Sequence, residues 1–137
     1  MARAVLIHSL DHARAAISAA AALGQPVVLV SAPHAAAYAG AGWFFEVIAM
    51  ARAEQAGVAV TAVLDCGDKP GLVLAALRRG IRAVRFTGRG SVRAKLESIA
   101  EQYGAVLYRD VGPALDLARE PDPERACRDW LAIDVGG

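Results

Sequence analysis

Residues 57–68 are Gly-Val-Ala-Val-Thr-Ala-Val-Leu-Asp-Cys-Gly-Asp. A glycine precedes a short apolar run rich in β-branched residues, and the run ends in polar residues. Such a run is typical of a strand that is buried on both faces of a parallel sheet. The glycine is typical of a helix end, because it adopts the left-handed backbone conformation that stops a helix. This stretch therefore predicts a helix, then a buried strand, then a polar loop that begins at Asp65.

The same change from helix to strand recurs along the chain. Glycines at positions 24, 80 and 104 also stand just before short apolar runs. Together with an apolar run near the N-terminus, the pattern predicts five strands, at residues 5–7, 27–30, 58–64, 81–86 and 105–108. Helical spacing of apolar residues predicts helices at 11–23, 42–56, 70–79, 113–119 and 124–133, and one that Ser91 caps at about residues 92–100.

Alternating strands and helices indicate an α/β protein with five parallel strands. Five units are too few to close an eight-stranded barrel. Two architectures stay open, a half TIM-barrel-like sheet and a flavodoxin-like open sheet with helices on both faces. We expect a single domain over residues 1–137, with strand–helix units in 1–112 and a helical segment in 113–137.

Composition narrows the classes of function. Hydrophobic residues make up 55% of the chain and charged residues 21%, which is typical of a folded globular domain. The net charge of +1 does not favour nucleic acid or a membrane surface as a partner. No apolar run is long enough to span a bilayer, and the N-terminus does not resemble a signal peptide. The two cysteines form no CxxC motif, so we expect a cytoplasmic protein with reduced thiols.

Polar residues gather at one end of the predicted sheet. Every loop that follows a strand is polar, whereas the loops at the opposite end are short and bland. In parallel α/β folds, ligands bind at the carboxyl ends of the strands. The most suggestive loop is residues 87–91, where two glycines, Arg89 and a helix start at Ser91 suit a phosphate or a carboxylate. A merely flexible connection is the alternative interpretation of this loop.

Other polar residues at the strand ends have two interpretations each. Asp65 could transfer protons, or it could cap its own loop. Cys66 could be a thiolate nucleophile or ligand, or a small buried residue. His8 and His34 could face one another and polarise a carbonyl, or they could be surface histidines.

At these positions the sequence resembles the class II, zinc-dependent fructose-bisphosphate aldolase family. Residues 63–68 resemble the family's His-Leu-Asp-His-Gly-Asp segment, and residues 76–88 are similar to its AI-x-x-G-F-x-S-V-M-x-D-G segment. Three further segments are similar in order and spacing: residues 10–31, Ser31 followed by Tyr38-Ala39-Gly40, and residues 108–112. The likeness covers about residues 5–112 and implies half of a TIM barrel.

The resemblance implies that Asp65 stands at the family's proton-transfer residue, and Asp110 at a metal-binding Glu. Cys66 stands at a histidine that binds zinc, Val63 at the preceding histidine, and Thr87 at the acid of the fourth strand. The family's remaining ligands come from later strands. A catalytic zinc needs about three protein ligands, so we expect no bound metal and no other cofactor.

We therefore expect a truncated, diverged relative of these aldolases that binds a small phosphorylated or carboxylated metabolite without a complete zinc site. Surviving chemistry would be that of a lyase, with Asp65 transferring the proton, but we do not expect zinc aldolase activity from the chain alone. The expected binding residues are Ser31, His34, Cys66, Thr87, Gly88, Arg89, Ser91, Asp110 and His8. The alternative is a non-catalytic oligomerisation or regulatory module, and in either case we expect a homo-oligomer.

Overall fold

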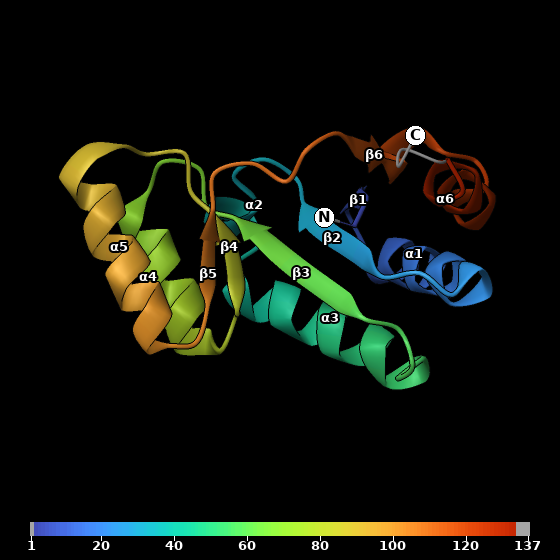
Figure 1. Cartoon of the computed structure of the whole chain (residues 1–137), viewed down its shortest axis with the longest axis horizontal. Helices are drawn as coiled ribbons and strands as arrows, with labels where there is room; N and C mark the ends of the chain where they lie inside the picture. Colours follow the sequence, from blue (N-terminus) through green and yellow to red (C-terminus); the bar gives the residue numbers. More distant parts are fainter. Residues whose placement is uncertain (1, 134–137) are drawn as a thin grey trace.

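The computed structural model describes residues 2–133, which form one curved parallel sheet with helices packed on it (Figure 1). The strands are β1 (Ala4–Ile7), β2 (Val27–Ser31), β3 (Val60–Asp65), β4 (Ala83–Arg85), β5 (Val106–Tyr108) and β6 (Ala114–Asp116). The helices are α1 (Leu10–Leu23), α2 (Ala35–Tyr38), α3 (Ala41–Glu54), α4 (Pro70–Arg79), α5 (Gly90–Gln102) and α6 (Pro123–Leu131), with a short 3-10 helix η1 (Leu117–Arg119). None of these helices is long and apolar enough to cross a membrane.

The six strands are all parallel and lie in the order β5-β4-β3-β2-β1-β6. The predicted α/β class and the five predicted strands are confirmed. Each of the first five strands lies beside its neighbour in sequence, as in consecutive units of a barrel. A flavodoxin-like sheet has the order 2-1-3-4-5 instead. The sheet is open and is not a closed barrel, because β5 and β6 form two separate edges.

The sixth strand corrects the prediction for the C-terminal segment. Residues 113–119 were expected to form a helix, but Ala114, Leu115 and Asp116 pair with Ala4, Val5 and Leu6 of β1. Leu117–Arg119 then forms the 3-10 helix. Pairing with an exposed edge of the sheet supplies backbone hydrogen bonds that outweigh the weak helical preference of so short a segment.

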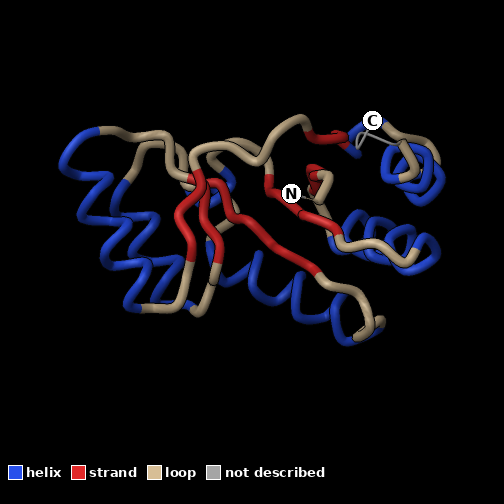
Figure 2. Tube along the Cα trace, viewed as in Figure 1, coloured by secondary structure: helices blue, strands red, loops and turns tan. Residues whose placement is uncertain are grey.

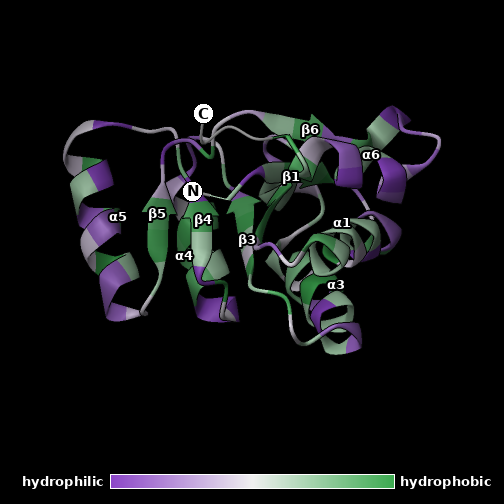
Figure 3. Ribbon diagram, turned by 45° about the vertical axis from the view of Figure 1, so that its right-hand side comes forward, coloured by the Kyte–Doolittle hydropathy of each residue, from purple (hydrophilic) through white to green (hydrophobic). Residues whose placement is uncertain are grey.

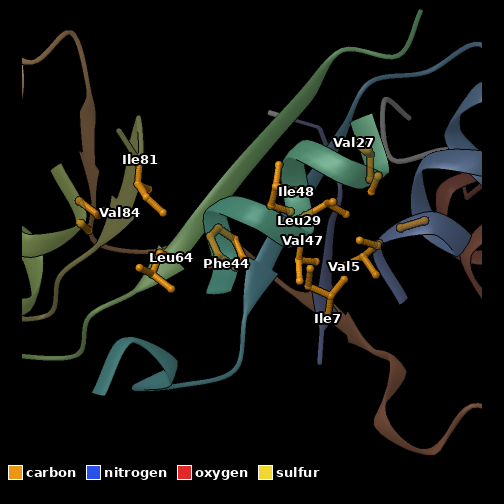
Figure 4. Close-up of a cluster of buried hydrophobic side chains, with 14 of the residues drawn as sticks. Val5, Ile7, Val27, Leu29, Phe44, Val47, Ile48, Leu64, Ile81 and Val84 are labelled. Atoms are coloured by element: carbon orange, nitrogen blue, oxygen red, sulfur yellow. The ribbon is translucent and has the colours of Figure 1, made fainter. Parts of the chain in front are cut away.

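The two faces of the sheet are covered in different ways. One face packs against the helices, and its core includes Ile17 of α1, Phe44 of α3 and Leu77 of α4. Figure 4 shows Phe44 in this core between Leu64 on one side and Leu29 and Ile48 on the other. The opposite face carries a smaller cluster that contains no helical residue. Its buried members are Ala4, Val28, Val30, Val63, Ala83 and Val111.

Val111 belongs to the connection that joins β5 to β6, residues 109–113, which covers the helix-free face. Figure 2 shows this connection passing from one edge of the sheet to the other. A flat six-stranded sheet would hold its edge strands about 24 Å apart. The six Cα-to-Cα steps from Tyr108 to Ala114 span at most about 22 Å, so the sheet must curve to let the connection reach β6. The curvature brings Val111, only 9% exposed, onto the small side chains of β2 and β3.

The C-terminal helix ties the two ends of the described chain together. Ser18 of α1 donates a hydrogen bond to the carboxylate of Glu124 in α6. Trp130 Nε1 donates to the carbonyl of Ala4 over 2.9 Å, and the guanidinium of Arg3 lies 3.9 Å from the Trp130 ring centre. α6 therefore packs beside α1 and anchors the strand β6 that precedes it.

Candidate functional site

Asp65, at the carboxyl end of β3, is the centre of a buried hydrogen-bond network. Asp65 is only 2% exposed, and its Oδ1 accepts hydrogen bonds from the backbone N–H of His34 at 3.0 Å and of Gly67 at 2.9 Å. Its Oδ2 accepts a hydrogen bond from Arg85 Nη1 at 2.7 Å. The N–H of Asp65 donates to the buried hydroxyl of Ser31 at 2.8 Å. The network thus joins the ends of β2, β3 and β4.

Arg85 belongs to this network but was not among the site residues expected from the sequence. Its Nε also donates to the carbonyl of Arg109 at 3.0 Å, which extends the network to the chain after β5. The ladder between β3 and β4 places Arg85 directly opposite Asp65. A charged residue inside the apolar run 81–86 was the signal available in the sequence, because buried strands carry a charge only where it is paired.

His34 enters this network through its backbone. It has a left-handed conformation with φ of 60°, the only positive φ among the described non-glycine residues. Such a conformation is costly for a residue with a side chain, and it persists where the surroundings enforce it. The hydrogen bond from its N–H to Asp65 supplies part of that enforcement, and its ring lies against Gly67. The imidazole itself is exposed to solvent at the carboxyl edge.

The loop that leads into α5 lies beside this network. Thr87 N–H donates to the carbonyl of Gly67 at 2.8 Å, and Arg93 Nη1 donates to the carbonyl of Phe86 at 2.6 Å. Gly88 allows the loop to approach Phe86 closely, since a Cβ there would stand 2.3 Å from the Phe86 ring. These contacts bring the predicted residues Thr87 and Gly88 next to the turn of Asp65.

The sequence predicted Ser91 as the N-cap of this helix, and that prediction is wrong. The helix begins at Gly90, and Arg89 occupies the cap position without any side-chain hydrogen bond to the first turn. Gly90, with its φ of 70°, lets the chain turn into the helix, which begins two residues earlier than it would after a serine cap at position 91. The first backbone N–H groups of α5 therefore have no side-chain acceptor within the described residues.

His8 lies in a different cluster. Its Nε2 lies 2.7 Å from Asp116 Oδ1 at the end of β6, and its backbone N–H donates to His12 Nδ1 at 3.0 Å. Burial and the neighbouring His8 lower the pKa of His12, and the N–H of Ala118 lowers the pKa of Asp116. His8 and His34 thus take part in separate networks. Asp110 is also apart, because its carboxylate accepts from Gly112 N–H in its own turn.

Cys66 is fully buried beneath the Asp65 turn, in the core on the helical face. Burial, with a smaller effect of the nearby Asp65 charge, raises the pKa of its thiol to about 12. Burial likewise raises the pKa of Cys127 to about 12. At neutral pH both sulfur atoms therefore carry protons, and a protonated thiol is a poor nucleophile.

We expect neither cysteine to react with a thiol-specific disulfide reagent at pH 8 in the folded protein, because only on the order of 10⁻⁴ of each thiol is ionised and both are buried. Both should react within minutes once urea unfolds the chain. Release of the reagent's chromophore measures the reaction. One equivalent of fast reaction before unfolding would show that one thiol is accessible and ionised.

A comparison with protein-family profiles matches residues 2–92 to fructose-bisphosphate aldolase class-II. This match spans more than half of the chain. The chain belongs to the class II fructose-bisphosphate aldolase family. A search of curated proteins finds no match to the chain. Within this aldolase family match lie β1 to β4, the Asp65 network and the loop before α5.

The residues at this aldolase-like centre do not suit the zinc ion that the sequence resemblance implies. Cys66 is fully buried in the core on the helical face, and the carboxylate of Asp65 already accepts three hydrogen bonds. Across residues 2–133, no three histidine, cysteine, aspartate or glutamate side chains are placed together to hold a metal. We derive no step through zinc for this aldolase-like chain.

Proposed function

We propose that this aldolase-family chain binds a small phosphorylated or carboxylated metabolite at the carboxyl edge of its sheet, without a complete zinc site. The observation that carries the proposal is that Arg89 is exposed and has no carboxylate partner among the described residues. Arg89 stands at the cap position of α5, and its guanidinium lies within 4 Å of no carboxylate in that part of the chain. A free cation next to uncapped helix N–H groups favours an anion.

The surrounding contacts support a preformed loop. Thr87 is held to Gly67, and Arg93 is held to the Phe86 carbonyl, so the loop on either side of Arg89 is fixed before a ligand arrives. Preorganisation of this kind lowers the entropic cost of binding. His34, exposed at the same edge, adds a hydrogen-bond donor or acceptor from β2. Thr87, Gly88, Arg89 and Ser91 would hold the anionic group, and His34 would contact the rest of the metabolite.

Asp65 has a positioning role in this proposal. Its three donors leave about one free lone-pair site on the carboxylate, which is poor preparation for taking a proton from a substrate. What the network does is fix the ends of β2, β3 and β4 beneath the ligand. A lyase reaction through Asp65 would first require the Arg85 guanidinium to move away.

The test is a calorimetric titration with fructose 1,6-bisphosphate, the sugar phosphate in the family's name. We expect saturable binding that Arg89→Gln weakens about tenfold, because a charge-assisted hydrogen bond contributes roughly 1.5–3 kcal/mol. Arg78→Gln, which removes an exposed arginine at the opposite end of the sheet, should bind as the wild type does. Equimolar zinc should leave the affinity unchanged.

Fructose without phosphates serves as the neutral ligand. Equal affinity for fructose and its bisphosphate, or an unchanged affinity in Arg89→Gln, would contradict the proposed anion site. The non-catalytic oligomerisation or regulatory module, and the homo-oligomer expected with it, stay predictions. A module of that kind would show no saturable binding in the same titration.

A further inference from the structure

A sizeable cavity of the described chain lies away from the carboxyl edge. It has a volume of about 570 Å³, within the range of small-molecule sites. It lies where the lower part of β3 diverges from β4 and β5, above α3 (Figure 1). Its walls come from β3, β4 and β5, and its floor comes from Phe44, Phe45 and Ile48 of α3. This is the amino-terminal half of the sheet, opposite the loop of Arg89.

Incomplete pairing between two strands creates the cavity. β3 pairs with β2 from Val60 to Val63, but it pairs with β4 only at Leu64 and Asp65. The backbone N–H and C=O of every second residue in a strand point to the same side. Because the N–H of Cys66 donates toward β4, the backbone groups of the even-numbered residues of β3 also face that side. Val60 and Ala62 therefore direct their backbone N–H and C=O toward the gap, where the described residues of β4 do not pair with them.

The lining combines an apolar interior with a basic rim. Phe44, Ile48 and Ile81 are buried around it, and Figure 3 shows the neighbouring strands β3 to β5 as largely hydrophobic. Arg52 and Arg82 are exposed at its edge. Neither guanidinium lies within 4 Å of a carboxylate in the described part of the chain.

Arg82 is held in place without being neutralised. Its Nη1 donates to the carbonyl of Tyr103, and this guanidinium nitrogen also lies near Gly104. A carbonyl fixes the orientation of the side chain but leaves its full positive charge. Among the described residues, the rim thus presents two cations whose charges no acidic partner offsets, beside a largely apolar lining.

We propose that this cavity is a second binding site, for a carboxylic acid with an apolar chain or ring. The apolar body would occupy the space above Phe44 and Ile48, and the carboxylate would meet Arg52 and Arg82. A free phosphate would leave the apolar interior to water, and a neutral apolar molecule would leave both arginines without an acceptor. The site is independent of the anion site at Arg89, because it lies at the other end of the strands.

Decanoate and 1-decanol provide matched probes, since they share the chain and differ in the charged head. We expect decanoate to bind the wild-type protein at least about tenfold more tightly than 1-decanol, as measured by titration calorimetry. Amide chemical shifts should change at residues 60–62 and 80–83. The double variant Arg52→Gln/Arg82→Gln should lose the preference for decanoate, and Arg128→Gln on α6 should keep it.

A cavity-filling variant, Ala62→Phe, should abolish binding of both probes while the double arginine variant still binds the apolar chain. Equal affinity for the two probes in the wild type would overturn the proposal. So would the absence of shift changes at 1 mM decanoate, or changes confined to the loop of Arg89. Titration of fructose 1,6-bisphosphate into Ala62→Phe should remain as in the wild type, which separates this site from the proposed function.

Discussion

Replacement of Asp65 by alanine is expected to lower the free energy of unfolding by about 3–5 kcal/mol. The substitution removes the acceptor for two backbone N–H groups, those of His34 and Gly67, and leaves the Arg85 guanidinium without its carboxylate. Each donor is then partly buried without a partner. The free energy of unfolding of a whole domain is about 5–15 kcal/mol, so this single change removes a large share of the stability. Urea denaturation followed by circular dichroism measures it.

Two other variants give this prediction its controls. Asp65→Asn retains one carbonyl acceptor for the backbone N–H groups but no charge for Arg85, so we expect a smaller loss than in Asp65→Ala. Asp68→Ala, three residues away and exposed, should change stability by less than about 0.5 kcal/mol. A loss below about 1 kcal/mol in Asp65→Ala would show that the network is not structural, and would return Asp65 to the role of a proton-transfer residue.

Val111→Asp is expected to destabilise the fold by about 3–4 kcal/mol. The side chain of Val111 packs on Val28, Val30 and Val63 at the helix-free face of the sheet, and it is 9% exposed. A carboxylate there would stand against the apolar side chains of this cluster. The connection 109–113 must then lift from the sheet, or the charge must remain buried and unpaired. Lifting would also remove the Arg109 carbonyl from Arg85, which couples this face to the Asp65 network.

Val92→Asp is the matched control for this substitution. Val92 is exposed in the first turn of α5, where a negative charge complements the helix dipole. We expect its stability to lie within about 0.5 kcal/mol of the wild type. Similar losses of stability in the two variants would mean that Val111 is not packed on the helix-free face. Residues 109–113 would then leave the sheet easily in solution.

Much of the fold could be predicted because its signals are local. The glycine that ends a helix and the β-branched run that follows it lie within a few residues of each other. Gly24 and Gly80 do end α1 and α4 in the left-handed conformation. Positions of the first five strands followed from these signals. β6 did not, because Ala114–Asp116 has no strong strand preference and becomes a strand only against β1.

The candidate site, like the fold, could be predicted from the sequence only in part. Parallel strands end at the same edge, so the sequence was enough to expect Ser31, His34 and Asp65 at one end of the sheet. It was not enough to pair Asp65 with Arg85, because that contact depends on the register between β3 and β4. A shift of one residue would turn the arginine to the other face. The sequence left open whether His8 faces His34 or the solvent, and only the pairing of β6 with β1 brings it Asp116 as a partner.

The sequence by itself determined the α/β class, the direction of the strands and the polar edge, because these depend on periodicity and on short-range backbone preferences. Only the tertiary structure decided that residues 109–113 cross the helix-free face and that β6 joins β1. The same holds for the cavity between β3 and β4. These features arise from contacts between residues far apart in the chain, where curvature and register select the partners and local propensity has no influence.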